Sequence, residues 1–259
     1  MKIGIIGGGN MARAILLGLL ANKTKAEDIF VADKDEKKLT ELQRFGIKVG
    51  NNEDALKYGE VIILAVKPDV YPVILPQCMG FDKLFISIAA GISISYIKSV
   101  LGESARVVRV MPNTPALVSS GMTAICRDGA SESDISVAVK IFSAVGEISV
   151  LDEKHIDAVV GVSGSGPALV FTLIEAMADG GVLKGLTRQD ALNLAAQTVL
   201  GSAKMVLETG NHPAHLRDMV CSPGGTTIEG VAALEECGFR SAVIKAVAAC
   251  AEKSKNLKK

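Results

Sequence analysis

Three consecutive glycines near the N-terminus constrain the fold of this chain more than any other feature. Residues 2–6 read Lys-Ile-Gly-Ile-Ile, a short apolar run, and Gly7-Gly8-Gly9-Asn10-Met11-Ala12 follows directly before a stretch with helical spacing. A G-x-G-x-x-A segment that closes a strand and opens a helix is typical of a dinucleotide-binding βαβ unit. Gly7 permits the tight turn, Gly9 lets the backbone approach a pyrophosphate, and Ala12 permits close packing of helix on strand. The sequence therefore predicts a Rossmann-type site at this turn.

Apolar runs alternate with helical stretches after the glycine turn. The predicted helices cover residues 11–20 and 36–45, and the further strand candidates are Ile29–Ala32, Val61–Val66, Phe85–Ala89 and Arg106–Val110. The run at Val61 is nearly all apolar and too short for a normal helix, as expected of a strand buried on both faces. This alternation predicts a doubly wound, parallel sheet.

The character of the sequence changes near residue 150. Beyond Asp152 the apolar spacing is helical only, with helices predicted from Pro167 to about residue 179, from the capping residue Thr187 to about 208, and over roughly 227–236 and 240–256. We predict a dinucleotide-binding domain at 1–152 and an all-helical domain for substrate binding and dimerisation at 153–259. The helices within 164–209 carry more apolar surface than so small a domain can bury, which indicates a homodimer.

Composition excludes several classes of function. Lys plus Arg and Asp plus Glu both number 28, so no overall positive field attracts nucleic acid. The five cysteines are scattered, without metal-type spacing, and fit free thiols in a reducing cytoplasm; Cys221 is expected to be a small buried residue rather than a nucleophile. His212-Pro213-Ala214-His215 has poor metal spacing, and all three histidines are expected to be structural or solvent-exposed. With no signal peptide and no uninterrupted apolar span expected, the chain reads as a cytoplasmic protein without a membrane segment.

Three segments are candidates for the rest of the cofactor site. Asp33 ends the second strand, where a carboxylate binds a ribose 2′-OH and favours NAD, whereas Lys34 favours a 2′-phosphate, so the preference between NADH and NADPH stays open. Ala65-Val66-Lys67-Pro68 follows a strand, and its proline turns the chain toward the ligand-binding edge. Ala90 lies in a run of small residues where a flat ring could lie close, although a simple turn explains that run equally well.

The segment Ser222-Pro223-Gly224-Gly225-Thr226-Thr227 precedes a predicted helix. Two glycines at a helix start leave backbone N–H groups free to hold a small anion such as a carboxylate. A tight turn with an N-cap explains the segment as well, but an ordinary cap needs one hydroxyl and this segment has three.

Six motifs in the same order make the chain resemble the pyrroline-5-carboxylate reductase family over essentially its whole length. They are Gly7-Gly8-Gly9-Asn10-Met11, Ala65-Val66-Lys67-Pro68, Ala89-Ala90-Gly91, Met111-Pro112-Asn113-Thr114-Pro115, Gly164-Ser165-Gly166-Pro167-Ala168 and Ser222-Pro223-Gly224-Gly225-Thr226-Thr227. The resemblance implies reduction of 1-pyrroline-5-carboxylate to L-proline with NADPH or NADH, by homodimers that sometimes assemble into rings.

The same resemblance implies roles for individual residues. Gly7, Gly8, Gly9, Asn10 and Met11 would contact the pyrophosphate region, Lys34 and Asn52 the adenosine ribose, and Ala65–Pro68 with Ala90 the nicotinamide. Thr227 would hydrogen-bond the ring nitrogen, and the backbone of Ser222, Gly224, Gly225 and Thr226 would hold the carboxylate. Because position 34 is often small and polar in relatives, Lys34 keeps the cofactor preference open.

Two alternatives remain on the residues alone. One is another enzyme on the same fold, either a reductase of a different cyclic imine or a hydroxy acid dehydrogenase. The dehydrogenase needs a catalytic lysine early in the helical half, and residues 163–183 contain none. The other is a non-catalytic nucleotide sensor, in which the segment Ser222–Thr227 would have no purpose.

Overall fold

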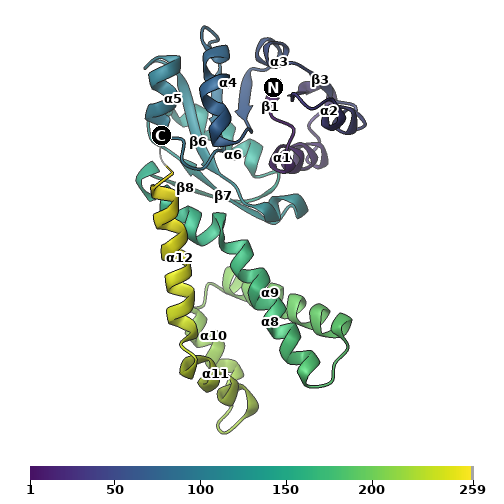
Figure 1. Cartoon of the computed structure of the whole chain (residues 1–259), viewed down its shortest axis with the longest axis vertical. Coiled ribbons are helices and arrows are strands. Elements are labelled where there is room, and N and C mark those ends of the chain that lie inside the picture. Colours follow the sequence, from purple (N-terminus) through teal and green to yellow (C-terminus); the bar gives the residue numbers. More distant parts are fainter. Residues whose placement is uncertain (258–259) are drawn as a thin grey trace. The chain divides into compact units, whose positions relative to one another are not determined.

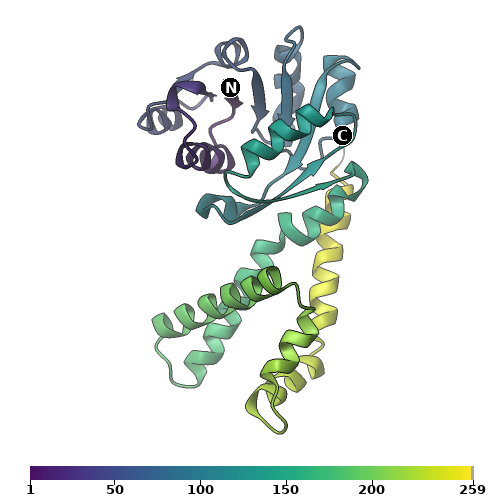
Figure 2. The ribbon, with the colours of Figure 1, turned by 180° about the vertical axis from the view of Figure 1, so that it is seen from behind.

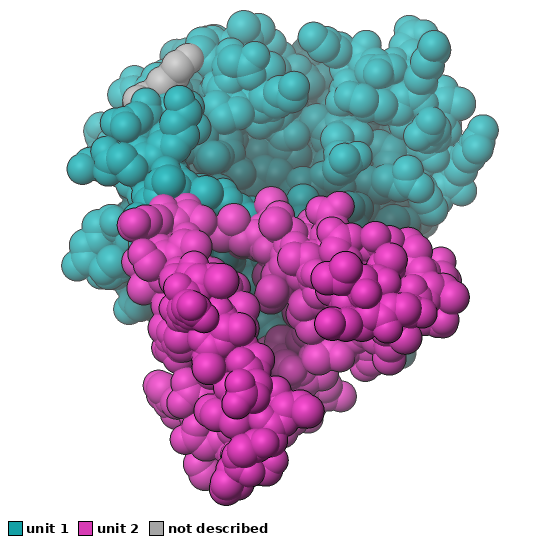
Figure 3. Space-filling view, turned by 60° about the horizontal axis from the view of Figure 1, so that its bottom comes forward, with its two compact units in different colours: residues 1–165, 248–259 teal, residues 166–247 magenta. Residues whose placement is uncertain are grey.

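The structure, a computed structural model, describes residues 1–257 in two compact units (Figure 3). Unit 1 holds Met1–Ser165 together with the chain from Ala248 onward, and unit 2 holds Gly166–Val247. The predicted division at residue 152 concerns function, with cofactor binding before it and dimerisation after it, and it stays a prediction. The last two positions of the predicted domain 153–259 lie outside the described residues.

Unit 1 is built on one sheet of eight strands (Figures 1 and 2). Their order is β3-β2-β1-β4-β5-β6-β7-β8. The strands are β1 (Ile3–Ile6), β2 (Ile29–Ala32), β3 (Lys48–Gly50), β4 (Val61–Leu64), β5 (Leu84–Ser87), β6 (Arg106–Met111), β7 (Gly121–Cys126) and β8 (Gly146–Leu151). The pairs from β3 to β6 are parallel, β6 and β7 are antiparallel, and β7 and β8 are parallel again. The prediction of a doubly wound sheet followed by a helical half is confirmed.

The order of strands places a topological switch beside β1. β1 pairs with β2 on one side and with β4 on the other, both in parallel. The chain therefore leaves β1 and β4 in opposite directions around the sheet, which opens a crevice at their carboxyl ends. The glycine turn follows β1, and the Ala65–Pro68 segment follows β4.

Helices cover both faces of the sheet (Figures 1 and 2). Apolar side chains of α1 (Asn10–Ala21) and α6 (Glu132–Phe142) pack on one face against residues such as Ile5 and Ile63. Those of α3 (Asn52–Tyr58), α4 (Tyr71–Cys78) and α5 (Ile94–Leu101) pack on the other face against residues such as Ile62 and Leu64. Adjacent residues of a strand point to opposite faces, so the continuous apolar runs are explained by burial on both sides.

Three strands were absent from the sequence prediction. β3 has only three residues, and β8 lies at the edge of the sheet with no fully buried residue. β7 reads Gly-Met-Thr-Ala-Ile-Cys, a mixture of small, polar and apolar residues. Short length, edge position and mixed composition each weaken the apolar pattern that identifies a strand.

Unit 2 consists of helices: α8 (Gly166–Leu183), α9 (Arg188–Thr209), α10 (Pro213–Val220), α11 (Thr226–Glu236) and the first turns of α12 (Phe239–Lys255). Thr187 caps α9 as predicted, since its hydroxyl accepts from the Asp190 N–H at 3.1 Å. The sequence prediction placed no helix between residues 208 and 227, whereas α10 lies there and begins with Pro213, whose position in the first turn disrupts no helical hydrogen bond.

The helices of unit 2 leave much apolar surface exposed. The buried core between α8 and α9 consists of Ala178, Ala191 and Ala195. Large side chains on the same helices face solvent, among them Phe171 at 62%, Leu183 at 82% and Leu207 at 79% exposed. By length and composition alone, the continuous helical run Glu153–Leu183 could also cross a membrane, contrary to the sequence expectation of no such span. Exposed apolar surface on this scale calls for a partner surface.

Candidate active site

The glycine turn lies at the carboxyl end of β1, next to the end of β4. Gly7 has a φ of +105°, and a Cβ placed on it would come within 2.4 Å of the Ala65 carbonyl oxygen. Its N–H donates to the Ala32 carbonyl at 2.7 Å. Only glycine fits a left-handed position this close to another strand, so the turn brings β1, β2 and β4 together as a cofactor site requires.

The start of α1 is open to a ligand. Gly9 is the N-cap residue, and no side chain among the described residues caps it. A Cβ placed on Gly9 would meet no described atom within 4 Å, whereas one on Gly8 would press on the Leu42 side chain. Asn10 is exposed and Met11 half-buried. A helix N-terminus with free N–H groups and open space above it fits a pyrophosphate.

Asp33 supports the glycine turn directly. Its Oδ2 accepts from the Gly8 N–H at 2.6 Å, and its Oδ1 accepts from the Asp35 N–H at 2.9 Å. Lys38 Nζ lies 3.8 Å from Oδ2, and the Asp33 side chain is 11% exposed. The carboxylate therefore holds the turn in shape, and its predicted contact with the ribose stays a prediction.

Lys34 and Asn52 lie at the same side of the sheet, near the ends of β2 and β3. Lys34 is exposed. Asn52 is half-buried at the start of α3, and its amide donates to Gln77 Oε1 at 2.9 Å. Both side chains thus remain candidates for contact with the adenosine end of a cofactor.

Two loops at the carboxyl ends of β4 and β5 carry the residues predicted to line the nicotinamide. Ala65 donates its N–H to the Ile6 carbonyl at 2.8 Å, which holds this loop against β1. Pro68 begins a short 3₁₀ helix (Pro68–Val70), while Val66 is half-buried and Lys67 exposed. Ala90 is half-buried, and Gly91 has a φ of +74°. Both loops leave the carboxyl edge of the sheet, the edge that also carries the glycine turn.

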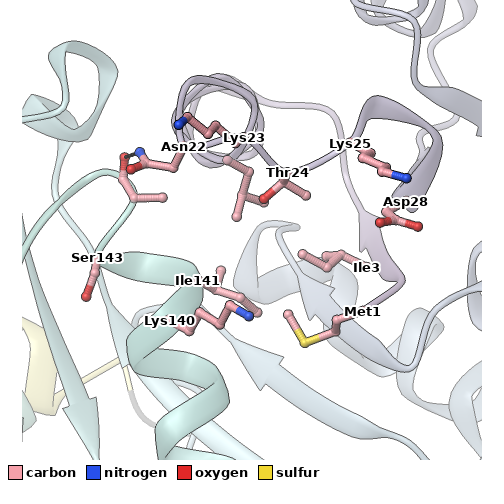
Figure 4. Close-up of a pocket in the computed structure, with 12 residues that line it drawn as sticks. Met1, Ile3, Asn22, Lys23, Thr24, Lys25, Asp28, Lys140, Ile141 and Ser143 are labelled. Atoms are coloured by element: carbon pink, nitrogen blue, oxygen red, sulfur yellow. Dashed lines mark hydrogen bonds between the residues drawn. The ribbon is translucent and has the colours of Figure 1, made fainter.

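A cavity lies at the other edge of the sheet. It has a volume of about 550 Å³, and Figure 4 shows Met1, Ile3 and Asp28 around it, with Lys140 from α6. Ile3 begins β1 and Asp28 directly precedes β2, so this is the amino edge. Ligands of open α/β sheets bind at the carboxyl edge, and no predicted site residue lines this cavity.

The second predicted site forms the start of α11 in unit 2. Gly224 has a φ of +65°, and the Gly225 N–H donates to the Ser222 carbonyl at 3.0 Å. This is a turn with proline in its second position and glycine in its third, an arrangement that requires a left-handed residue there. A Cβ on Gly225 would lie 2.2 Å from Ser222 Oγ. The local sequence is therefore matched to this turn.

The hydroxyls beside the turn are not used as helix caps. Gly225 is itself the N-cap of α11 and has no side chain with which to bond the first-turn N–H groups. Within residues 1–257, the hydroxyls of Ser222, Thr226 and Thr227 have no hydrogen-bond partner; Thr227 is half-buried and the other two residues are exposed. The first turn of α11 thus offers unpaired N–H groups next to free hydroxyls, an arrangement that can bind an anion.

The remaining titratable candidates show no catalytic arrangement. His155 and His215 are exposed, and His212 caps α10 by accepting from the Ala214 N–H at 3.2 Å. No group of three or more potential metal ligands occurs within residues 1–257. Burial raises the pKa of Cys78 and of Cys126 to about 12, so both thiols stay protonated. Cys221 is half-buried.

One ion pair near the candidate site was not anticipated. Arg109 in β6 is buried, and its Nη1 lies 2.8 Å from Glu153 Oε1, which also accepts from the Ile94 N–H at 2.9 Å. The pair ties the start of α5 to β6. Its only sequence signal is an arginine between two valines of β6, a strand that also begins with Arg106, and the pattern does not say which carboxylate meets Arg109.

Two family models cover most of the chain. The family described as pyrroline-5-carboxylate reductase dimerisation matches residues 153–257. The family described as NADP oxidoreductase, coenzyme F420-dependent, matches residues 2–91. The first match falls on the helical half and the second on the part of the sheet that holds the glycine turn.

Full-length relatives point the same way. The pyrroline-5-carboxylate reductase of Escherichia coli (strain K12) is 47% identical over 265 aligned positions, covering 100% of this chain and 98% of the relative. A solved pyrroline-5-carboxylate reductase from Coxiella burnetii superposes with a TM-score of 0.93 at 35% identity, covering 100% and 98% of the two chains. A solved pyrroline carboxylate reductase from Plasmodium falciparum with NADP bound gives a TM-score of 0.90 at 34% identity, with coverage of 100% and 98%.

Proposed function

The chain belongs to the pyrroline-5-carboxylate reductase family, and from this premise we propose how its own residues perform the reaction. The enzyme reduces 1-pyrroline-5-carboxylate to L-proline with NAD(P)H, the last step of proline biosynthesis. A hydride adds to the imine carbon and the ring nitrogen carries a proton, so the C=N bond becomes a C–N single bond with one new C–H bond. The protein must hold the carboxylate, orient the ring and bind the nicotinamide.

The observation that carries the proposal is the uncapped start of α11. The N–H groups of its first turn have no helical acceptor, and Gly225 supplies no capping side chain. A carboxylate is the natural ligand of such a helix end, because it accepts from several N–H groups and meets the positive end of the helix dipole. We assign the carboxylate of the substrate to the backbone of Ser222–Thr226, where the Gly224 and Thr226 N–H groups have no acceptor among the described residues, while the Gly225 N–H donates to the Ser222 carbonyl.

Thr227 is assigned to the ring nitrogen. It lies in the first turn of α11, one residue past Thr226, and its half-buried hydroxyl has no partner among the described residues. A hydroxyl fixed at the imine nitrogen stabilises the charge that changes there as hydride arrives. Since the imine nitrogen can bind already protonated, Thr227 orients the ring and need not act as an acid.

The glycine turn and its neighbours are assigned to the cofactor. Gly7–Met11 would hold the pyrophosphate, since Gly9 leaves the start of α1 open, and Asp33, Lys34 and Asn52 would lie near the adenosine ribose. Ala65–Pro68 and Ala90 would line the nicotinamide. When bound, the dihydronicotinamide supplies the hydride. The residues of unit 1 thus bind and orient the donor, and those of unit 2 hold the acceptor.

The exposed apolar helices are assigned to the homodimer. The matched dimerisation family covers residues 153–257, which include exposed side chains such as Phe171 and Leu207. We attribute the apolar character of the run Glu153–Leu183 to this interface and not to a membrane, and we propose a cytoplasmic enzyme whose dimers can assemble into larger rings. Light scattering tests the assembly: a monomer would contradict the dimer, and a single dimer species would contradict the ring.

Enzyme assay tests the function. Addition of 1-pyrroline-5-carboxylate to the protein with NADPH or NADH should consume the reduced cofactor and yield L-proline in equal amount. Other cyclic imines and 2- or 3-hydroxy acids with the oxidised cofactor serve as comparison substrates. Faster turnover of one of these would favour the alternative enzymes, and binding of NADPH without turnover of any would favour a sensor.

A further inference from the structure

A buried tyrosine at the start of α4 meets both loops that are assigned to the nicotinamide. Tyr71 is 0% exposed, and its hydroxyl donates to the Leu64 carbonyl at 3.1 Å. The same oxygen lies 2.7 Å from Ser87 Oγ, and Ser87 is also 0% exposed. Because the phenol has one proton and gives it to Leu64, the Ser87 hydroxyl is the donor in the second bond.

These contacts fall where the two loops begin. Leu64 is the last residue of β4, Ser87 is the last residue of β5, and the two are paired across the strands. The first loop leaves Leu64, passes through residues 65–70 and ends at Tyr71, so the hydroxyl returns to the carbonyl from which that loop starts. The second loop leaves Ser87 and contains Ala90. One phenol therefore closes the first loop and anchors the second.

Burial keeps the Tyr71 phenol protonated. Burial raises the pKa of Tyr71 far above its ordinary value of 10.0, although the Ser87 hydroxyl and the Ala89 N–H act in the opposite direction. The phenol thus remains a hydrogen-bond donor and carries no charge that could take part in catalysis. Its contribution is one of geometry.

We propose that Tyr71 is a positioning residue that sets the shape of the nicotinamide-binding loops through Leu64 and Ser87. The proposal rests on the assignment of residues 65–68 and Ala90 to the nicotinamide. It adds to that assignment a side chain that touches neither cofactor nor substrate and that no motif in the sequence indicated. Loops that are fixed by hydrogen bonds to one buried side chain lose less conformational entropy when they bind the nicotinamide ring.

Tyr71→Phe is the direct test, because it removes the hydroxyl and keeps the ring in the core. Amide hydrogen exchange of the free protein should become faster in residues 65–70 and 88–91 and stay unchanged in the glycine turn. Affinity for NADPH should fall about three- to tenfold, the range expected for one neutral hydrogen bond, while affinity for 2′,5′-ADP, which lacks the nicotinamide, should not change.

Two further variants keep the test decisive. Tyr58→Phe is a matched control, since the Tyr58 hydroxyl also donates to a backbone carbonyl in unit 1, that of Glu27, which lies before β2 at the amino edge of the sheet. It should leave both loops and both affinities unchanged. Ser87→Ala removes the second bond only and should loosen residues 88–91 but not 65–70; it also serves if Tyr71→Phe fails to fold.

The outcomes separate this proposal from the proposed function. Unchanged exchange in both loops of Tyr71→Phe, or an equal loss of affinity for NADPH and 2′,5′-ADP, would overturn the positioning role. Faster exchange in the loops with unchanged NADPH affinity would show that the tether exists but that these loops do not bind nicotinamide, and would count against the assignment of residues 65–68 and Ala90 instead.

Discussion

Replacement of Thr227 by valine isolates the hydroxyl that we assign to the ring nitrogen. Valine has the shape of threonine, so the half-buried site keeps its packing and α11 keeps its start at Gly225. The hydroxyl has no partner among residues 1–257, so its removal breaks no bond within the described chain. A hydrogen bond to a charged group contributes about 1.5–3 kcal/mol. We therefore expect kcat/KM for 1-pyrroline-5-carboxylate to fall about ten- to hundredfold.

The assay is initial-rate kinetics of cofactor oxidation over a range of imine concentrations. Thr227→Ser restores the hydroxyl and should recover most of the loss. Thr226→Val removes the neighbouring exposed hydroxyl, which we assign no contact through its side chain, and should keep kcat/KM close to the wild-type value. Wild-type kinetics in Thr227→Val, or equal losses in the Thr226 and Thr227 variants, would refute the role of Thr227 at the nitrogen.

Three other predictions follow from the same structure. Gly224→Ala places a side chain at a φ of +65° in open space, which disfavours the native turn by roughly 1–2 kcal/mol. The KM for 1-pyrroline-5-carboxylate should therefore rise about five- to thirtyfold with little change in kcat. A change in kcat alone would count against the assignment of the carboxylate to Ser222–Thr226. Asp33→Ser should lower the affinity for both NADH and NADPH, because the Gly8 N–H loses its acceptor. It should also shift the ratio of the two affinities in favour of NADPH, and an unchanged ratio would exclude a contact between Asp33 and the ribose. Burial raises the pKa of Cys78 and Cys126 from 9.0 to about 12, so the folded chain keeps protons that the unfolded chain releases, and the free energy of unfolding should fall as pH rises from 9 toward 12. Denaturant titrations over this pH range should show a smaller decrease in the free energy of unfolding, by up to about 1.4 kcal/mol per pH unit, when either cysteine is replaced by alanine.

Local sequence was a good guide wherever short-range chemistry decides the structure. The turns at Gly7 and Gly224 depend on left-handed conformations that few residues adopt, and the cap at Thr187 depends on a hydroxyl within reach of the Asp190 N–H, so the residues themselves indicate the backbone. Apolar runs such as Val61–Leu64 were equally clear, because burial on both faces leaves no polar position.

Contacts between residues far apart in the sequence could not be predicted from local sequence patterns. The strand β8 owes its place to β7, and neither has a distinctive pattern of its own. Tyr71 reads as an ordinary apolar residue of α4, and its role appears only when β4 and β5 bring Leu64 and Ser87 beneath its hydroxyl. Asp33 was expected to face a ribose, and its bond to Gly8 depends on the fold of the turn.

The most direct test of the whole account compares 1-pyrroline-5-carboxylate with 1-pyrroline, the same imine without the carboxylate. If the first turn of α11 holds the carboxylate, loss of its charge-assisted hydrogen bonds should lower kcat/KM for 1-pyrroline at least about a hundredfold. Gly224→Ala should reduce the difference in kcat/KM between the two imines, since it disturbs the Ser222–Thr226 turn that only 1-pyrroline-5-carboxylate contacts through its carboxylate. Equal kcat/KM for the two imines in the wild-type enzyme would contradict the account.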